Sequence, residues 1–367
     1  MSVLERRVAG AGLAAGTTTP GDRRIAATEG RRECAVERPI SRVALIVVPC
    51  LNEAGGIDAL LWSLREATDA ANLRIVVADG GSTDGSRALI ARHARMSGGR
   101  VALLDNPQRL QSAGVNRAVR RHGTGCEFVI RVDAHGAVPS DFVETLLDEA
   151  RATGADSVTC SMLNEGQAPF QRAVACAQSS VLGNGGAAHR LASGEGAWVD
   201  HGHHALMRVD AFGAVGGYDE TFRANEDAEL DLRLRGAGGR IWLTGRTAVT
   251  YHPRGTPAAL FRQYWHYGRG RARTVRKHRL VPRLRQLLPL GVAPAVAALG
   301  LAGLTPWAAL PALAWGLGCV AGGLVVGASL GVRAALLVSL AVAIMHLAWS
   351  LGFWRQILAS SGTGAAR

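Results

Sequence analysis

The stretch VALIVVPCLNE, residues 43–53, decides the fold. Its first six residues form a continuous aliphatic run, typical of a strand buried on both faces of a parallel sheet, and Pro49 is expected to end it. The run LRIVV at 73–77 repeats the pattern and leads into a glycine-rich turn, DGGSTDG at 79–85. Two such strands, each followed by a polar turn, indicate an α/β domain.

Further helices and strands continue this alternation along the chain. Segments of helical character at 57–64 and 88–94 follow the first two strands, and aliphatic runs at 101–104 and 128–132 predict two more strands. The alternation predicts a Rossmann-like α/β fold with a mostly parallel sheet over residues 41–256. In such sheets ligands bind beyond the carboxyl ends of the strands. The polar residues expected at those ends are Asn52, Glu53, Asp79, Asp84, Asp133 and His135.

Composition limits the class of protein. The 367-residue chain has a formal net charge of +12, and no acidic residue follows Asp231. No recognised nucleic-acid-binding module accompanies the positive charge, so we expect no nucleic-acid partner. The six cysteines are scattered without a CxxC pair, which favours reduced thiols in a cytosolic domain over disulfides or a zinc site. Residues 1–40 lack periodicity, so we expect a disordered N-terminal segment.

The C-terminal third of the chain is expected to bind a membrane. Residues 257–286 are basic and aromatic, as expected of an interfacial segment beside anionic lipid. The charge-free apolar runs that follow are 287–304, 307–330 and 334–354. Each is long enough to cross a hydrocarbon core of about 30 Å. Because these helices are apolar all round, an anchor of about three helices at 287–356, with a tail at 357–367, is favoured over a soluble bundle.

The charge distribution predicts how the anchor is oriented. The positive-inside rule places the basic segment and the α/β domain in the cytoplasm, at the inner membrane. Three complete spans would make the protein multi-pass and leave its C-terminus on the opposite side. The first run is short and contains Pro289 and Pro294, so a re-entrant helix is an alternative to a span there.

The tripeptide Asp133-Ala134-His135 follows a predicted strand. Side chains at i and i+2 of an extended segment point the same way, so Asp133 and His135 could hold one divalent cation. A cation there can bridge the phosphates of a nucleotide diphosphate and stabilise them as a leaving group. An imidazole beside a carboxylate favours Mn²⁺ somewhat over Mg²⁺. A solvated turn without a metal is the alternative for the tripeptide taken alone.

Glu226 and Asp227 precede a further predicted helix. Acidic residues in a first helical turn are stabilised by the helix dipole and need no catalytic role. The functional interpretation is that Asp227 takes a proton from an acceptor hydroxyl. Glu229 and Asp231, one turn later, are predicted to be solvated helix charges. The glycine-rich turn at 79–85 also has two interpretations. Its backbone could approach a ligand closely, or it could be an ordinary loop that provides a helix N-cap.

Six motifs in a fixed order resemble a known family. They are VPCLNE at 48–53, ADGGSTDGS at 78–86, Asn116 in QSAGVNRA, RVDAH at 131–135, GGYDE at 216–220 and NED at 225–227. Together they are similar to the inverting glycosyltransferases of family 2, which share the GT-A nucleotide-diphospho-sugar transferase fold. The resemblance covers residues 43–279. The DAH motif, QYWHYG at 263–268 and HLAW at 346–349 resemble the succinoglycan-type exopolysaccharide transferases in particular.

The resemblance implies roles for individual residues. The donor nucleotide would be bound by Pro49, Asn52, Glu53, Asp79, Gly81, Ser82, Asp84, Asn116 and Asp133. Asp133 and His135 would hold the metal, Asp227 would be the base, and Glu226 beside it is the second catalytic candidate. Family members often have two adjacent acidic residues where this chain has Asp79 followed by Gly80, which leaves base specificity open.

The segment after residue 256 departs from one family motif. Processive synthases carry Gln-x-x-Arg-Trp, whereas this chain has Gln263 followed by Tyr264, Trp265 and two further residues that do not match. The departure favours transfer of a single sugar. These three residues, with Arg269 and Arg271, are expected at the acceptor and membrane interface, where the aromatics form a belt or stack on a sugar.

Four histidines have no assigned role in this interpretation. They are His201, His203, His204 and His252. A metal cluster is one possibility for the first three, and alternation along a strand beside an acceptor pocket is as plausible.

The expected function is metal-dependent, inverting transfer from a nucleotide sugar, a UDP-sugar in the first instance, to a hydroxyl of a polyprenyl-linked saccharide. Membrane lipids and other polysaccharide-assembly proteins are the expected partners. One rival is a polyprenyl-phosphate sugar transferase, whose acceptor phosphate needs no strong base. The other is a non-catalytic membrane scaffold of an export assembly, against which the intact Asp133 and Asp227 argue. The sequence does not indicate which sugar, linkage or polymer is made.

Overall fold

The computed structural model describes residues 42–68, 73–186, 196–282 and 284–361. The chain divides into two units, residues 1–38 and 39–367, and the description below concerns the second. The segment 1–40 that we predict to be disordered lies outside the described residues.

Strands and helices alternate through the first half of the described chain. The strands are β1 (Arg42–Cys50), β2 (Leu73–Asp79), β3 (Val101–Asp105), β4 (Cys126–Arg131), β5 (Ser157–Asn164), β6 (Ala197–Val199), β7 (His203–Arg208) and β8 (Ile241–Tyr251). The helices are α1 (Ile57–Thr68), α2 (Ser86–Met96), α3 (Gln111–His122), α4 (Phe142–Thr153), α5 (Pro169–Gln178), α6 (Val181–Asn184), α7 (Val209–Ala214), α8 (Glu226–Gly236), α9 (Pro257–Lys277), α10 (Leu284–Ala298), α11 (Leu310–Val326) and α12 (Val332–Ser361).

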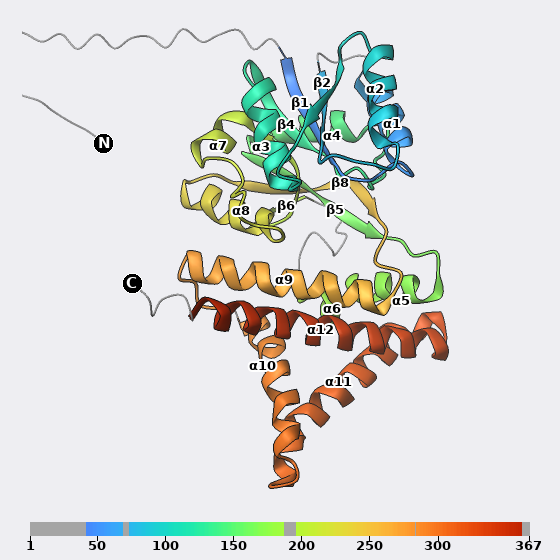
Figure 1. Ribbon diagram of the computed structural model, residues 1–367, viewed down its shortest axis with the longest axis vertical. Coiled ribbons are helices and arrows are strands. Elements are labelled where there is room, and N and C mark those ends of the chain that lie inside the picture. Colours follow the sequence, from blue (N-terminus) through green and yellow to red (C-terminus); the bar gives the residue numbers. More distant parts are fainter. Residues whose placement is uncertain (1–41, 69–72, 187–195, 283, 362–367) are drawn as a thin grey trace, which may run out of the picture. The chain divides into compact units, whose positions relative to one another are not determined.

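The described strands form one sheet in the order β3-β2-β1-β4-β7-β5-β8-β6. Four neighbouring pairs are parallel, namely β1 with β2 and β4, β2 with β3, and β5 with β8. The other three pairs are antiparallel. The predicted α/β fold with a mostly parallel sheet is therefore confirmed (Figure 1). The two strands that run antiparallel to their neighbours are β7, between β4 and β5, and β6, at the edge beside β8.

Side chains of β1 show why helices cover both faces of the sheet. Ile46 and Val48 pack in one core with residues of α1, α2 and α4. Leu45 and Val47, which point to the other face, pack in a second core with residues of α3, α7 and α8. All four side chains are fully buried. The unbroken aliphatic run at 43–48 thus forms a strand with two apolar faces, as predicted.

Pro49 does not end the first strand, contrary to the prediction. β1 continues to Cys50, and Pro49 lies opposite Ala78 of β2. The ladder continues past the proline because Gly80 N–H donates to the Cys50 carbonyl at 2.8 Å, a bond that needs no N–H from Pro49.

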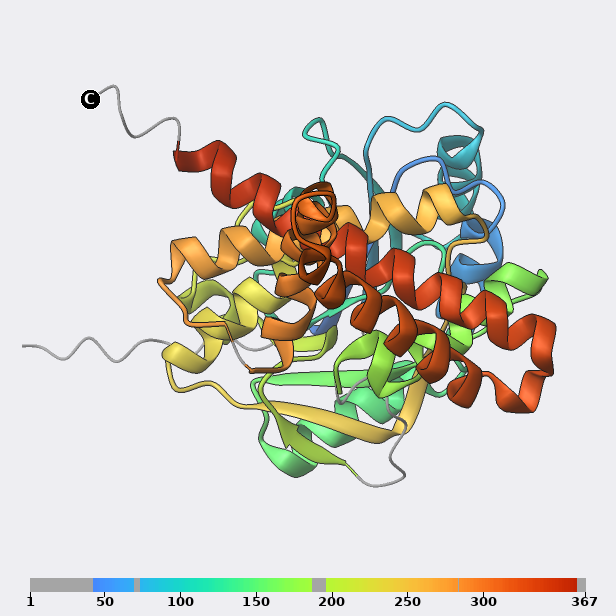
Figure 2. The same ribbon diagram turned by 90° about the horizontal axis from the view of Figure 1, so that it is seen from below.

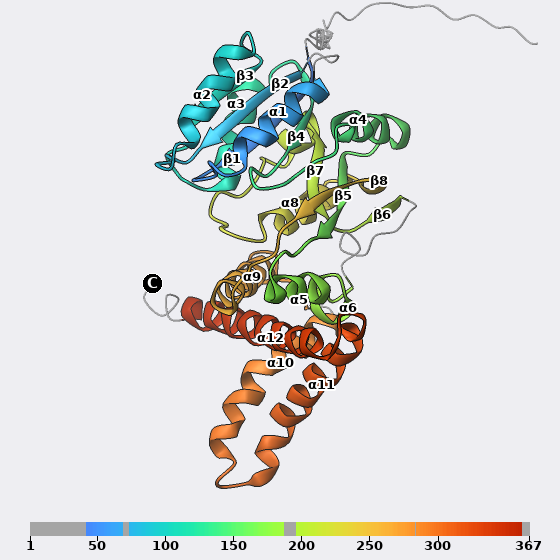
Figure 3. The ribbon, with the colours of Figure 1, turned by 90° about the vertical axis from the view of Figure 1, so that its right-hand side faces the viewer.

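The C-terminal helices form a separate layer below the sheet domain. α9 and α12 lie side by side beneath the sheet, with α5 packed against α12 (Figures 1 and 3). α10 and α11 extend away from them and approach each other at their far ends. Seen from below, α12 extends across the underside of the α/β domain (Figure 2).

The predicted apolar runs correspond to α10, α11 and α12. Among the described residues, two helical stretches are long and apolar enough to cross a membrane, Pro306–Val326 and Val332–Ala359. The first run forms a shorter apolar helix, Leu287–Leu301. Helix α12 continues to Ser361, past the boundary at residue 356 that the sequence suggested.

Candidate active site

Asp133 and Asp227 open onto the same cavity, which has a volume of about 1510 Å³. Asp133 follows β4, and Asp227 lies in the first turn of α8, which begins at Glu226 as predicted. Both are also close to β7, because His203 Nε2 lies 3.6 Å from Asp133 Oδ2 and His203 Nδ1 lies 3.7 Å from Asp227 Oδ2. Residues 94 positions apart in the sequence are thus brought to one site.

A buried arginine joins these carboxylates. Arg131 Nε lies 3.1 Å from Asp133 Oδ1, Nη1 lies 2.7 Å from Asp227 Oδ1, and Nη2 lies 3.6 Å from Glu226 Oε1. Only 3% of its side chain is exposed. We call Arg131, Asp133, Glu226 and Asp227 the carboxylate cluster. Sequence reasoning missed Arg131, although an arginine inside the apolar run FVIRV at 128–132 requires a buried partner.

The shared arginine affects the titration of the cluster. Burial disfavours the charged form of each carboxyl group, but the charges of Arg131 and His203 outweigh it at Asp133, whose pKa lies well below its usual range. At Glu226, burial and the charge of Asp227 raise the pKa instead. Asp133 and Glu226 share one guanidinium but are therefore not equivalent, since the pKa of Asp133 is lowered and the pKa of Glu226 is raised.

A second chain of contacts holds Asp227, on the face of the sheet that is covered by α3, α7 and α8. The Tyr218 hydroxyl donates to Asp227 Oδ1 at 3.0 Å. Asn116 of α3 is buried, and its amide accepts from Tyr218 N–H at 2.9 Å and donates to the Tyr218 carbonyl at 2.8 Å. Gly217 is required beside it, because a Cβ there would lie 2.6 Å from the Asn116 side-chain oxygen. Asn116, predicted to bind nucleotide, thus positions Tyr218 and also donates to Glu220 Oε1 at 2.9 Å, and contact with a donor stays a prediction.

Helix α9 fixes the start of α8. Asn225 precedes α8 with a φ of 63°, and its side chain donates to the Tyr267 carbonyl of α9 at 3.1 Å. A Cβ at Gly270 of α9 would collide with the Ala224 carbonyl, so only glycine permits this approach. The first turn of α8, which carries Glu226 and Asp227, is therefore set by contact with the C-terminal layer.

The geometry expected for the Asp133-Ala134-His135 motif is wrong in one respect. The segment is a turn, closed by Gly136 N–H donating to the Asp133 carbonyl at 2.9 Å, and not an extended strand. His135 is about half exposed and lies 3.5 Å from Glu53 Oε1, whereas the imidazole beside Asp133 is that of His203. In this turn the Asp133 carboxylate lies 3.1 Å from Nε of Arg131, two residues earlier in the chain.

The donor atoms suit a cation shared with a ligand. Over the described residues, no group of three or more His, Cys, Asp or Glu side chains is arranged to hold a metal ion. Asp133 faces the cavity together with the imidazoles of His135 and His203. This set fits a divalent cation that completes its coordination with phosphate oxygens.

The residues predicted to bind nucleotide lie mostly in the turns after β1 and β2. Asp79 is buried. Its carboxylate accepts hydrogen bonds from Arg87 Nη1 at 2.6 Å and from Ser82 Oγ at 2.5 Å. It also accepts from the backbone N–H groups of Gly81 and Ser82. The two turns are joined by further bonds: Asn52 N–H to Ser82 Oγ, Thr83 N–H to Asn52 Oδ1, Glu53 N–H to Ser86 Oγ and Ala54 N–H to Asp84 Oδ2. We call Asn52, Asp79, Ser82, Asp84 and Ser86 the loop cluster. None of these residues lines the large cavity, nor does Pro49.

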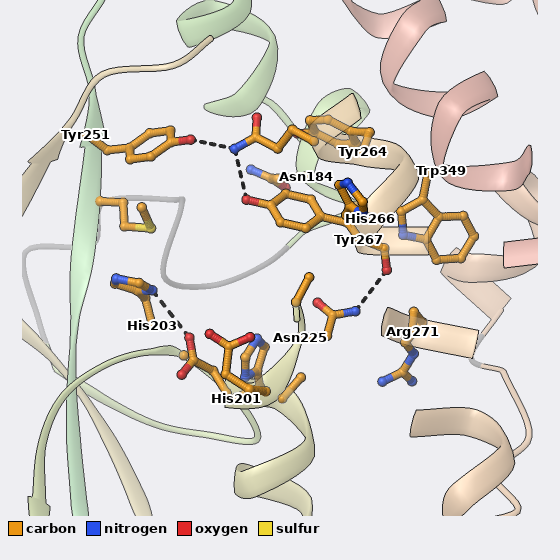
Figure 4. Close-up of a pocket in the computed structure, with 18 of the residues that line it drawn as sticks. Asn184, His201, His203, Asn225, Tyr251, Tyr264, His266, Tyr267, Arg271 and Trp349 are labelled. Carbon is orange, nitrogen blue, oxygen red and sulfur yellow. Dashed lines mark hydrogen bonds and ion pairs between the residues drawn. The ribbon is translucent and has the colours of Figure 1, made fainter. Parts of the chain in front are cut away.

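The residues predicted at the acceptor interface separate into two groups. Gln263, Tyr264 and Arg271 line the cavity, and Gln263 Nε2 donates to the hydroxyls of Tyr251 at 2.7 Å and Tyr267 at 3.1 Å (Figure 4). Trp265 and Arg269 do not line it. Arg269 donates to Gln356 of α12 at 3.2 Å, and Trp265 stacks on Phe261.

Glu229 and Asp231 are buried, so the prediction that they are solvated is wrong. Asp231 Oδ2 lies 2.6 Å from Nδ1 of His201, which lines the cavity. Glu229 Oε1 lies 2.6 Å from Lys277 Nζ and 2.9 Å from His278 Nε2, at the end of α9. Both carboxylates face other segments of the chain: Asp231 faces His201 and Gly202, which precede β7, and Glu229 faces the end of α9. The side chain of His204 is outside the described ones, and His252 contacts only the Glu165 carbonyl, at 3.1 Å.

Comparison with known proteins places the chain in a family. The family model "Glycosyl transferase family 2" matches residues 45–216. The succinoglycan biosynthesis protein ExoA of Rhizobium meliloti (strain 1021) is 52% identical over 321 residues, which cover 87% of this chain and 96% of that protein. The chain belongs to glycosyltransferase family 2.

A solved structure supports the fold of this family 2 glycosyltransferase. The mannosyltransferase PcManGT from Pyrobaculum calidifontis, determined in complex with GDP-Man and Mn2+, superposes with a TM-score of 0.54 at 20% sequence identity. The match covers 87% of this chain and 88% of that one. The family 2 enzyme therefore has the GT-A fold that its motifs predict.

Proposed function

We propose that this glycosyltransferase moves one sugar, with inversion, from a nucleotide-diphosphate donor to a hydroxyl of a lipid-linked saccharide in exopolysaccharide synthesis. The relative from Rhizobium meliloti is named for succinoglycan biosynthesis and matches over nearly its whole length. A UDP-sugar is the donor to test first. The enzyme would act at the cytoplasmic face of the inner membrane, where its apolar helices α10, α11 and α12 hold it.

The observation that carries the proposal is the mixed lining of the cavity. Asp133, Glu226 and Asp227 line it, and so do Val281, Leu288 and other apolar residues of the C-terminal layer. Tyr264, Tyr267 and Trp349 lie along the cavity on the side of the C-terminal helices (Figure 4). A cavity lined by both carboxylates and apolar side chains suits an acceptor with a saccharide head and a lipid tail.

Five arginine side chains besides Arg131 also line the cavity. They are Arg223, Arg235, Arg254, Arg262 and Arg271. Guanidinium groups bind phosphate oxygens through paired hydrogen bonds, so these residues suit the diphosphate of a lipid-linked acceptor. Of the basic residues of α9, Arg269 and Lys277 are bound to Gln356 and to acidic residues instead. Only part of the basic segment is therefore available to a phosphate.

In the reaction, Asp227 is the base. Arg131 and the Tyr218 hydroxyl hold its Oδ1, and we assign its Oδ2 to accept the proton of the acceptor hydroxyl. The deprotonated oxygen attacks the anomeric carbon as the bond to the donor diphosphate breaks. A divalent cation held by Asp133 with His135 or His203 would supply positive charge to that leaving diphosphate. Arg131 holds both carboxylates in place while the sugar lies between them.

The test is Asp227→Asn, assayed in membranes with radiolabelled nucleotide sugars and scored as label in the lipid extract. We expect transfer to fall by at least about 10³-fold while nucleotide binding, measured with and without Mn²⁺, is retained. Glu165→Gln, at an exposed carboxylate distant from the cluster, is the matched control and should transfer at the wild-type rate. Near-normal transfer by Asp227→Asn would favour a lipid phosphate as acceptor, because a phosphate needs no base.

A further inference from the structure

The helices of the C-terminal layer differ in their ability to enter lipid. α9 carries Arg262, Arg269, Arg273 and Arg276 along its length. Charged residues are unfavourable at the centre of a spanning helix, so a helix with arginines along its length cannot lie within hydrocarbon. Its position beneath the sheet domain places it at the membrane surface.

α12 runs parallel to α9 and packs against most of its length. At one end Leu260 shares a core with Val338 and Val342, and at the other Ala272 shares one with Phe353. Between these contacts the two backbones touch. A Cβ at Gly268 of α9 would collide with the carbonyl of Trp349, and a Cβ at Gly352 of α12 would collide with the carbonyl of Trp265.

This packing decides where α12 lies. Close contact through glycines on both helices is the geometry of a tight helix pair. If α12 crossed the bilayer, it would carry the arginines of α9 into the hydrocarbon with it. Although its length and hydropathy suit a span, α12 is therefore held in the plane of the membrane surface beside α9.

At their far ends, within the described part of the chain, α10 and α11 contact mainly each other and the short turns that join them. No charged residue occurs between Arg285 and Arg333. Large apolar side chains along and around this hairpin are exposed, among them Leu288, Leu299, Leu304, Trp307, Leu313, Leu317 and Val325. Such a surface needs a lipid environment, since an exposed patch of this kind is unfavourable in water.

The first turns of α10 are bonded to α12 through the Leu290 carbonyl, which has no donor within its own helix. Pro294 has no N–H, so the Leu290 carbonyl accepts instead from Trp354 Nε1 at 2.8 Å and Ser350 Oγ at 3.1 Å. Ser350 Oγ also accepts from Ala293 N–H at 2.9 Å. Pro294 is thus accommodated where α10 contacts α12.

The far end of the hairpin suits hydrocarbon and not water. Its backbone is bonded internally: Leu304 and Thr305 N–H donate to the Leu301 carbonyl at 2.9 and 3.0 Å, and Ala308 N–H donates to the Thr305 carbonyl at 3.0 Å. Backbone groups at membrane depth must be satisfied in this way. From Leu290 to Leu304 the hairpin reaches only about 21 Å at 1.5 Å per residue, short of the core thickness of about 30 Å.

We propose that α10 and α11 form a re-entrant hairpin that enters one leaflet and returns, with α12 lying at the surface. The C-terminus then stays on the same side as the catalytic domain, contrary to the three spans that the sequence suggests. The inference rests on the membrane location in the proposed function. It adds that no part of residues 42–361 reaches the far side.

Reporter fusions test the side of each terminus. Green fluorescent protein, which fluoresces only in the cytoplasm, is fused in turn to the N- and C-termini of the full chain, and alkaline phosphatase, active only after export, is fused to the C-terminus. We expect fluorescence from both ends and no phosphatase activity. An active C-terminal phosphatase would mean an odd number of crossings and would overturn the proposal.

A single cysteine separates a re-entrant hairpin from one that crosses twice. Gly303→Cys places a thiol near the hairpin end, where an added Cβ meets nothing within 4 Å. The matched control is Gly255→Cys, in an exposed loop of the catalytic side with equal space, and the parent chain gives the background labelling. A membrane-impermeant maleimide should label residue 255 only after permeabilisation and residue 303 in neither case. Labelling of residue 303 in intact spheroplasts would overturn the proposal.

The same membranes are assayed for sugar transfer to lipid. Wild-type transfer together with a labelled residue 303 would reject the hairpin and leave the enzyme function standing. An unlabelled residue 303, fluorescent termini and no transfer with any nucleotide sugar would support the hairpin and reject the function. Active enzyme in the soluble fraction after lysis would overturn the hairpin directly, because its exposed apolar surface could not then be in lipid.

Discussion

The carboxylate cluster and the loop cluster of this enzyme both contain aspartate side chains, but their surroundings differ. In the carboxylate cluster, Asp133, Glu226 and Asp227 come from two distant segments, share one guanidinium and face a large cavity. In the loop cluster, Asp79 and Asp84 are bonded to backbone N–H groups and hydroxyls of adjacent turns and do not line that cavity. The carboxylates of the loop cluster are satisfied by groups of the two turns and by Arg87, whereas those of the carboxylate cluster share one guanidinium and line the cavity in which we propose that the substrates bind.

The largest expected effect comes from removing that shared cation. Arg131→Met should lower the free energy of unfolding by about 3–5 kcal/mol, because it leaves buried carboxylates without their partner. Unfolding of the detergent-purified enzyme by denaturant measures the loss. Arg208→Met removes a partly exposed arginine paired with Glu127 and should cost about 1 kcal/mol or less. Equal losses in the two variants would show that the cluster does not depend on Arg131.

A smaller effect is expected in the loop cluster. Asp79→Asn keeps the shape of the side chain but loses the charge that attracts Arg87 and Ser82, so the free energy of unfolding should fall by about 1.5–3 kcal/mol. The turnover number at saturating donor should stay within about threefold of wild type, since Asp79 does not line the cavity. A 100-fold fall in turnover with unchanged stability would place Asp79 with the catalytic residues and end the distinction between the clusters.

The smallest effect concerns Asp219, which joins Lys277 of α9 at 2.7 Å. Burial alone would raise its pKa, but Lys277 and Thr221 lower it from 3.8 to about 2. Because folding lowers the pKa, the ionised group stabilises the fold above pH 3.8, and this contribution is lost as the pH falls toward 2. The stability difference between wild type and Asp219→Asn should be about 1 kcal/mol or less at pH 6 and vanish by pH 2. A difference independent of pH would assign the effect to packing.

Parts of the site could be predicted from residue order alone. Strands end where the aliphatic runs end, so Asp133 was expected at the sheet edge, and the acidic pair at 226–227 was expected to begin a helix. Tyr218 and Arg131 stood inside recognised motifs, GGYDE and RVDAH, yet had no assigned role. Their roles depend on α8 lying against β4, and no local pattern encodes that contact.

The sequence by itself determined the α/β architecture, the family and the apolar character of the C-terminal helices, because periodicity and motif spacing are local properties of a chain. Only the tertiary structure decided that Glu229 and Asp231 are buried, that His203 and not His135 lies beside Asp133, and that α12 lies along α9. Burial and ion pairing depend on which surfaces meet. Those surfaces belong to residues separated by 30 to 100 positions, so their meeting is fixed only when the sheet and the helical layer pack together.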